Sequence, residues 1–118
     1  MCCLEIVFHI RRLEGGAMLA EFSIVPIGVG SSIGDKVAEV LGIVDASGLP
    51  YKVTPMGTVI EGEWDEVMKL LKECHTTIML TEERVVTSIT IDDRPGKLNR
   101  INEKVYSIER RLGKSLKK

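Results

Sequence analysis

Two hydrophobic periodicities alternate along the chain, and their order limits the folds that it can adopt. Residues 19–27 alternate with period two, so that Phe22 and Ile24 share one face and their neighbours share the other, which predicts a strand. A glycine- and serine-rich turn with a serine N-cap leads into a helix, which Gly48 is placed to end. The apolar stripe of this helix consists of Ile33, Val37, Val40, Leu41 and Val44.

The middle of the chain predicts a hairpin and a second helix. Residues 51–56 and 58–62 are rich in β-formers and flank a Pro-Met-Gly turn. Acidic residues then gather at 63–66, where the N-terminus of a helix favours negative charge. The stripe of this second helix consists of Val67, Leu71, Cys74 and Ile78.

The last third predicts one more strand and one more helix. Residues 84–92 have the period of a half-buried strand with one notably polar face. Residues 98–112 carry a narrow, heptad-like apolar stripe, which is typical of a helix that packs on a partner or on an exposed surface. This stripe consists of Leu98, Ile101, Val105, Ile108 and Leu112.

The resulting order, β-α-β-β-α-β, predicts a ferredoxin-like α+β fold with an antiparallel four-stranded sheet and an additional C-terminal helix. In that fold both internal helices cover one face of the sheet, and the other face stays open unless something packs on it. The open face would carry Glu21, Ser23 and Val25 together with one of the two alternating sets of the last strand. Because a second copy commonly closes such a surface, we expect a homo-oligomer.

The chain of 118 residues suits a single domain, which we place at residues 18–118. Residues 1–17 form a separate leader. We hypothesise that translation of the native protein starts at Met18, because codons for Glu14-Gly15-Gly16 just before it would resemble a bacterial ribosome-binding site. The alternative is a genuine extra strand, since LEIVFHI is rich in β-formers.

Charge and composition argue against several classes of partner. A net charge of -1 and an aromatic content of 4% disfavour nucleic acid, which needs cationic contacts and stacking platforms. No apolar run reaches the roughly 18–20 residues of a membrane helix, so we expect no membrane anchor. An odd count of three cysteines argues against a disulfide framework, and we therefore expect a cytoplasmic protein.

Most motifs that could signal catalysis have a simpler structural interpretation. Gly28, Gly30 and Gly34 invite a dinucleotide site, but the hairpin that follows contradicts a parallel sheet. Cys74 and His75 are adjacent on a helix and point about 100° apart, so a buried structural cysteine is favoured over a reactive pair. Two histidines without ligand spacing supply no metal site. Residues 92–94 end a strand at a Pro-Gly turn, or cap a pocket.

The segment PMGTVIEG, residues 55–62, is the best candidate for a binding site. Met56 beside Gly57 opens an apolar recess, and Thr58 offers a hydroxyl group. Glu61 and Glu21 place carboxylates on strands, where burial without a partner is costly. The alternative is that both are exposed strand carboxylates.

Three segments in order, EFSIVPIGVGSS, YKVTPMGTVIEGE and ERVVTSITIDDR, resemble the thiamine-binding protein family over roughly residues 18–112. The resemblance implies a ferredoxin-like fold, dimers that pair into tetramers, and binding of thiamine or its hydroxymethyl-aminopyrimidine half without catalysis or a cofactor. Relatives often carry a lysine where Thr90 stands, which puts an anion contact from that position in doubt.

The ring nitrogens and exocyclic amine of an aminopyrimidine need a neighbouring acceptor and donor, which a carboxylate beside a hydroxyl supplies. We therefore expect the site to comprise Ser23, Met56, Gly57, Thr58 and Glu61, with Glu21 as an alternate carboxylate. A second hypothesis is an oligomeric regulatory or structural module that binds a protein through its open sheet face or C-terminal helix. A third, an acylphosphatase-like hydrolase, is disfavoured because no arginine-bearing phosphate loop follows the first strand.

Overall fold

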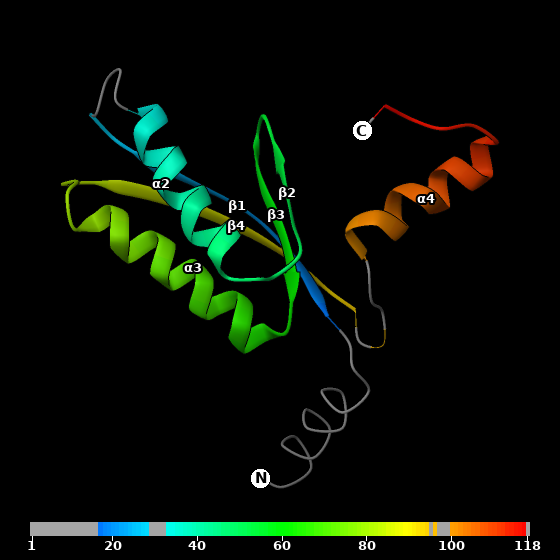
Figure 1. The fold of residues 1–118 in the computed structure, drawn as a ribbon, viewed down its shortest axis with the longest axis horizontal. Coiled ribbons are helices and arrows are strands. Elements are labelled where there is room, and N and C mark those ends of the chain that lie inside the picture. Colours follow the sequence, from blue (N-terminus) through cyan, green and yellow to red (C-terminus); the bar gives the residue numbers. More distant parts are fainter. Residues whose placement is uncertain (1–16, 29–32, 95, 97–99, 118) are drawn as a thin grey trace, which may run out of the picture.

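The computed structural model describes residues 17–28, 33–94, 96 and 100–117. Its elements follow the predicted order and are drawn in Figure 1. They are β1 (Met18–Pro26), α2 (Ile33–Ala46), β2 (Tyr51–Thr54), β3 (Gly57–Gly62), α3 (Trp64–Met79), β4 (Val85–Asp93) and α4 (Arg100–Leu112). The predicted leader, apart from Ala17, and the predicted serine N-cap lie outside the described residues.

The four strands form one sheet in the order β2-β3-β1-β4, and every neighbouring pair is antiparallel. This arrangement confirms the predicted ferredoxin-like α+β fold with an additional C-terminal helix. Neighbouring strands of this sheet are all antiparallel, so no parallel pair carries a dinucleotide turn at Gly28, which follows β1, or at Gly34, which lies in the first turn of α2. Gly30 lies outside the described residues.

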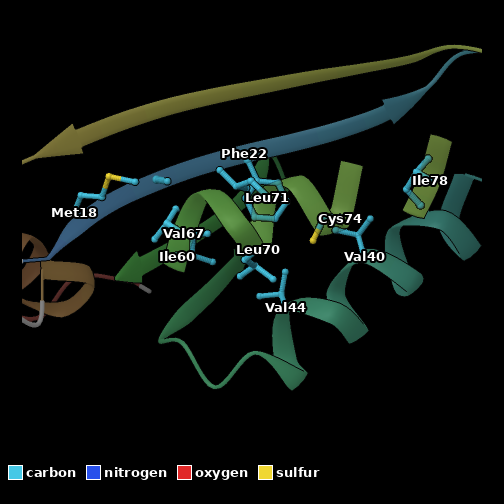
Figure 2. Close-up of a cluster of buried hydrophobic side chains, with 11 residues drawn as sticks. Met18, Phe22, Val40, Val44, Ile60, Val67, Leu70, Leu71, Cys74 and Ile78 are labelled. Atoms are coloured by element: carbon cyan, nitrogen blue, oxygen red, sulfur yellow. The ribbon is translucent and has the colours of Figure 1, made fainter. Parts of the chain in front are cut away.

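The core lies between one face of the sheet and the helices α2 and α3, which pack side by side (Figure 1). Figure 2 shows side chains from both layers meeting there. The cluster consists of Met18, Ala20, Phe22, Val40, Val44, Ile60, Val67, Leu70, Leu71, Cys74 and Ile78. Even-numbered residues of β1 and β3 therefore face the helices, and odd-numbered residues face the opposite, open side.

Cys74 is a core residue, as the sequence indicates. Its side chain is fully buried in α3, and burial raises the pKa of its thiol to about 11. The neighbouring His75 turns away from it, and its Nδ1 lies 2.6 Å from the hydroxyl oxygen of Thr87 on β4. The two side chains therefore do not form a thiolate-imidazole pair.

Local signals explain where the internal helices begin and end. Gly48 has a φ of 78°, a conformation that suits glycine and that stops α2 within two residues of its end. At the start of α3 the side chain of Glu66 accepts a hydrogen bond from the backbone N–H of Glu63, at 3.4 Å. These ends set the lengths of the two helices that cover the sheet.

The C-terminal helix α4 does not join the other two helices. It starts on the open face of the sheet, where three hydrogen bonds hold its first turn. The buried Glu61 carboxylate on β3 accepts a hydrogen bond from the backbone N–H of Ile101 at 3.2 Å. Arg100, which is also buried, donates to the backbone oxygen of Asp92 on β4 at 2.7 Å and to its carboxylate at 2.6 Å. Beyond this turn α4 extends away from α2 and α3 (Figure 1).

Candidate functional site

The strand pairs of the sheet do not have equal lengths, and this difference opens a gap. Pairing between β1 and β3 stops at Phe22 opposite Thr58, whereas pairing between β1 and β4 continues to Pro26 opposite Val85. Residues 23–26 of β1 thus have no strand beside them on the side of β3. The hairpin of β2 and β3 diverges from β1 and β4 at this level (Figure 1).

A cavity of about 240 Å³ lies at this gap. Its floor is the free edge of β1, its side wall is the tip of the hairpin, and its roof is the first half of α2. The lining residues are Phe22, Ser23, Ile24, Val25, Ile33, Val37, Val40, Leu41, Val53, Thr54, Pro55, Met56, Gly57 and Thr58. None of them has a side chain that ionises in the physiological range.

Two hydrogen bonds show which backbone groups face the cavity. The N–H of Ile27 donates to the oxygen of Arg84 on the β4 side, at 2.9 Å, and the N–H of Glu61 donates to the oxygen of Pro50 on the β2 side, at 3.0 Å. Because successive residues of a strand direct their N–H and C=O groups to opposite sides, the even-numbered residues of β1 face β3. Ile24 therefore presents its N–H and its C=O to the cavity, at a level where the register gives it no β3 partner.

Gly57 lets the hairpin approach β1 closely. A Cβ atom at this position would lie 2.9 Å from the backbone oxygen of Phe22, which is closer than real Cβ atoms come. The hydroxyl of Thr54 fixes the turn, because it donates to the oxygen of Gly57 at 2.8 Å and accepts from the N–H groups of Met56 and Gly57 at 3.3 and 3.1 Å. These hydrogen bonds thus fix the conformation of the hairpin tip, which forms one wall of the cavity.

The structure brings four of the six predicted site residues together. Ser23, Met56, Gly57 and Thr58 all line the cavity, with Met56 almost fully exposed at its rim. Glu21 is exposed on the open side of the sheet, and its Cγ lies 3.5 Å from the position that a Gly57 Cβ would take, so it borders the cavity without lining it. Glu61 lies farther along β3, where its carboxylate holds α4.

Two groups of lining residues are absent from the sequence-based prediction. Ile33 and Val37 belong to the apolar stripe of α2 but remain about two-fifths exposed, since the strand beneath them has no β3 neighbour at the gap. The sequence did carry a signal for these two residues, because the apolar stripe of α2 extends beyond the part of the sheet in which β1 and β3 pair. The free backbone edge at Ile24 has no sequence signal, because it depends on where the β1–β3 register ends.

A second cluster, of charged side chains, lies at the other end of β4. Asp92 accepts hydrogen bonds from Lys104 at 2.8 Å and from Arg100 at 2.6 Å, and these two cations lower the pKa of its carboxyl group. Sequence reasoning left two interpretations of Asp92, the end of a strand or the cap of a pocket, and it did not identify the α4 cations as its partners. The signal was available in the basic residues of α4.

Within the described residues no group of three or more His, Cys, Asp and Glu side chains is placed to hold a metal ion. The helices of that same part of the chain are too short or too polar to cross a membrane.

Comparison with known proteins gives consistent matches. A family model described as thiamine-binding protein matches residues 20–109. The UPF0045 protein MJ1052 of Methanocaldococcus jannaschii is 38% identical over 91 residues, which cover 77% of this chain and 91% of that protein. A UPF0045 protein of Synechocystis is 34% identical over 105 residues, covering 88% of this chain and 87% of the relative.

Solved structures agree with these sequence matches. The crystal structure of MJ1052 has a TM-score of 0.72 and covers 78% of this chain and 95% of its own. A Thermotoga maritima protein, whose name proposes a role in thiamine biosynthesis or salvage, is 25% identical with a TM-score of 0.70 and covers 78% of this chain and 98% of its own.

Proposed function

Because the chain belongs to the thiamine-binding protein family, we propose that its cavity binds the aminopyrimidine ring of thiamine or of hydroxymethyl-aminopyrimidine without catalysis. The observation that carries this proposal is the free edge of β1 at Ile24, which offers a hydrogen-bond donor and an acceptor side by side within an apolar cavity.

An aminopyrimidine matches this edge chemically. Its ring nitrogen accepts a hydrogen bond, and its exocyclic amine, on the adjacent carbon, donates one. The N–H of Ile24 can donate to the ring nitrogen, and the C=O of the same residue can accept from the amine. The ligand would thus extend the sheet by one strand-like pair of hydrogen bonds. The hydroxyls of Ser23 and Thr58, which line the cavity, would complete the polar contacts, and Met56 would cover the ring.

The size of the cavity favours one ring over the whole vitamin. Pockets that enclose drug-sized ligands usually measure roughly 300–1,000 Å³, and this cavity is smaller, at about 240 Å³. The pyrimidine therefore occupies the enclosed part, and the rest of thiamine extends past the rim near Met56. Glu21 borders that rim and is placed to meet the cationic thiazolium.

The lining supports binding over catalysis. Proton transfer at neutral pH needs a side chain with a suitable pKa beside the ligand, and the described lining contains only apolar, hydroxyl and thioether side chains. Glu61 does not fill this gap, because its carboxylate is engaged by α4. We place this binding protein in the cytoplasm, in keeping with its buried free thiol at Cys74.

A pair of substitutions in α2 tests the proposal. Val37→Phe puts a ring into the roof of the cavity, and calorimetry should show at least a roughly tenfold loss of affinity for thiamine and hydroxymethyl-aminopyrimidine. Ala38→Phe adds the same ring at the next residue, which is exposed and does not line the cavity, and it should bind as the wild type does. Equal affinity of both variants and the wild type would remove the cavity from the binding site.

We also propose that the protein is a homo-oligomer, a dimer or a dimer of dimers, closed through the open sheet face and α4. The open face exposes Val25 and Val86, and the apolar stripe of α4 leaves Ile108 and Leu112 about half exposed. A helix with an uncovered apolar stripe and a sheet with an uncovered face can each bury the other in a second copy. The same surfaces would serve the alternative function, a module that binds another protein.

Light scattering decides between these states. The wild type should give a mass of two or four times the 13.1 kDa of one chain. Ile108→Asp places a charge in the α4 stripe and should lower that mass, whereas Ser115→Asp adds the same charge beyond the helix and should not. A wild-type monomer in dilute solution would contradict the oligomer and favour a different protein as the partner of this surface.

A further inference from the structure

A second, larger cleft of about 500 Å³ lies between the end of β4 and the polar side of α4. Its lining residues are Asp92, Arg94, Arg100, Glu103, Lys104, Ser107 and Arg110. Asp92 pairs with Leu19 at the start of β1, whereas the cavity described above meets β1 at Phe22–Val25. At about 3.3 Å per residue the two sites are separated by roughly 10–20 Å along the strand. The cleft is therefore a separate site.

The α4 side chains in this cleft come from one face of the helix. Arg100, Lys104, Ser107 and Arg110 follow one another at spacings of four, three and three residues, which places them in one row. Arg94 faces this row from the end of β4. The row and the strand end therefore point cationic groups into one space.

Positive charge exceeds negative charge in the cleft. Four cations, Arg94, Arg100, Lys104 and Arg110, line it together with two carboxylates, Asp92 and Glu103, so the excess is two positive charges. Asp92 alone balances Arg100 and Lys104, at 2.6 and 2.8 Å, and Arg110 meets Glu103 only at 3.5 Å. Arg94 pairs with no acidic side chain among the described residues.

The cleft is also partly preorganised. The Arg100 side chain is only 7% exposed, and its two contacts with Asp92 fix the position of its guanidinium group. Three of its five N–H donors remain for other partners. The Asp92 carboxylate is held by two cations, which offsets its repulsion of an incoming anion.

We infer that this cleft binds a phosphate group, either as inorganic phosphate or as the terminal group of a small phosphate monoester. Arg94, Lys104 and Arg110 would contact it directly, and Arg100 would position Asp92 away from it. A phosphate carries a charge of about −1.5 to −2 at pH 7, which matches the excess of two positive charges better than a carboxylate does. Guanidinium groups bind its oxygens in a bidentate manner, and Ser107 adds a hydroxyl donor.

Two adjacent arginines of α4 provide a matched test in the full-length protein. Arg110→Gln removes a lining cation, and Arg111→Gln removes the same charge from the next residue, which does not line the cleft. Both side chains are exposed, so neither change should affect folding. Calorimetry with inorganic phosphate and with glycerol 3-phosphate, at constant ionic strength in chloride, should show saturable binding that Arg110→Gln weakens about tenfold and Arg111→Gln leaves nearly unchanged.

The two ligands identify the source of the phosphate. Tighter binding of glycerol 3-phosphate than of inorganic phosphate assigns the cleft to a phosphorylated metabolite, and the reverse assigns it to the free anion. Absence of saturable binding of either ligand, or equal weakening by both substitutions, would overturn the inference. Binding of hydroxymethyl-aminopyrimidine should be the same in the wild type and in Arg110→Gln. The proposals for the cavity and for the cleft are therefore tested independently.

Discussion

At the scale of single residues, Gly57 is the described glycine with the least room for a side chain. Gly57→Ala would place a Cβ 2.9 Å from the Phe22 backbone oxygen, so the hairpin must move away from β1. We expect a loss of roughly 1–3 kcal/mol in the free energy of unfolding, as is usual for overpacking, together with weaker ligand binding. Urea denaturation and calorimetry measure the two effects.

Gly34→Ala is the matched control for that substitution. A Cβ at Gly34 meets nothing within 4 Å, and the residue lies in the first turn of α2. The exchange should therefore stabilise the protein, by up to about 1 kcal/mol. If Gly57→Ala were as well tolerated as Gly34→Ala, the close approach of hairpin and strand could not be what shapes the cavity.

The sequence predicted which side chains could contact a ligand better than it predicted where those side chains lie. Ser23, Met56, Gly57 and Thr58 meet at one cavity because they lie on neighbouring strands, as the predicted hairpin and sheet require. Glu61 directly follows Ile60, on a part of β3 that meets the first turn of α4, and no local pattern shows that this helix begins there. Replacing Glu61 with Gln and measuring thiamine affinity remains the test of whether it also contacts the ligand.

At the scale of elements, the docking of α4 depends on the charge of Asp92. Lys104 and Arg100 lower the pKa of this carboxyl below its ordinary value. A group with a lowered pKa in the folded state stabilises that state above its unfolded pKa, which is about 3.9, and loses the effect as the pH falls through the folded value. We therefore expect the amides of α4 to lose protection from hydrogen exchange as the pH falls below about 4. The amides of α2 and α3 should lose protection only at a lower pH.

Two substitutions at neighbouring residues distinguish the loss of the Asp92 contacts from other effects of low pH on the protein. Asp92→Asn should release α4 already at pH 6, because the amide cannot hold both cations as strongly as the carboxylate does. Asp93→Asn removes the same charge from the exposed next residue and should leave exchange in α4 unchanged. Equal exchange in the two variants would mean that the Asp92 contacts do not anchor the helix.

The lengths of the elements could be predicted from periodicity and turn residues, whereas their uneven pairing could not. The stripe of α2 indicated a core helix over its whole length, and Val40 and Val44 are indeed buried. Ile33 and Val37 are not, because the strand beneath them has lost its β3 neighbour. The stripe of a helix reports which residues are apolar, and the register of the sheet decides which of them reach the core.

At the scale of the whole molecule, the fold separates two surfaces with different chemistry. One end of β1 borders an apolar cavity without ionisable side chains, and the other end lies near a cleft with an excess of cations. The order of strands and helices was sufficient to predict the ferredoxin-like architecture. It was not sufficient to predict the shape of the cavity or the presence of the cleft, because these depend on where strands stop pairing and where α4 begins.

The central claim is that an aminopyrimidine docks on the free edge of β1. A titration of the ¹⁵N-labelled protein with hydroxymethyl-aminopyrimidine, followed by amide NMR spectra, tests it directly. The backbone amides of Ile24 and Gly57 should show the largest chemical-shift changes, and the Ile24 amide should shift downfield as it donates to the ring nitrogen. Changes centred on the amides of α4, with Ile24 unaffected at saturation, would contradict it.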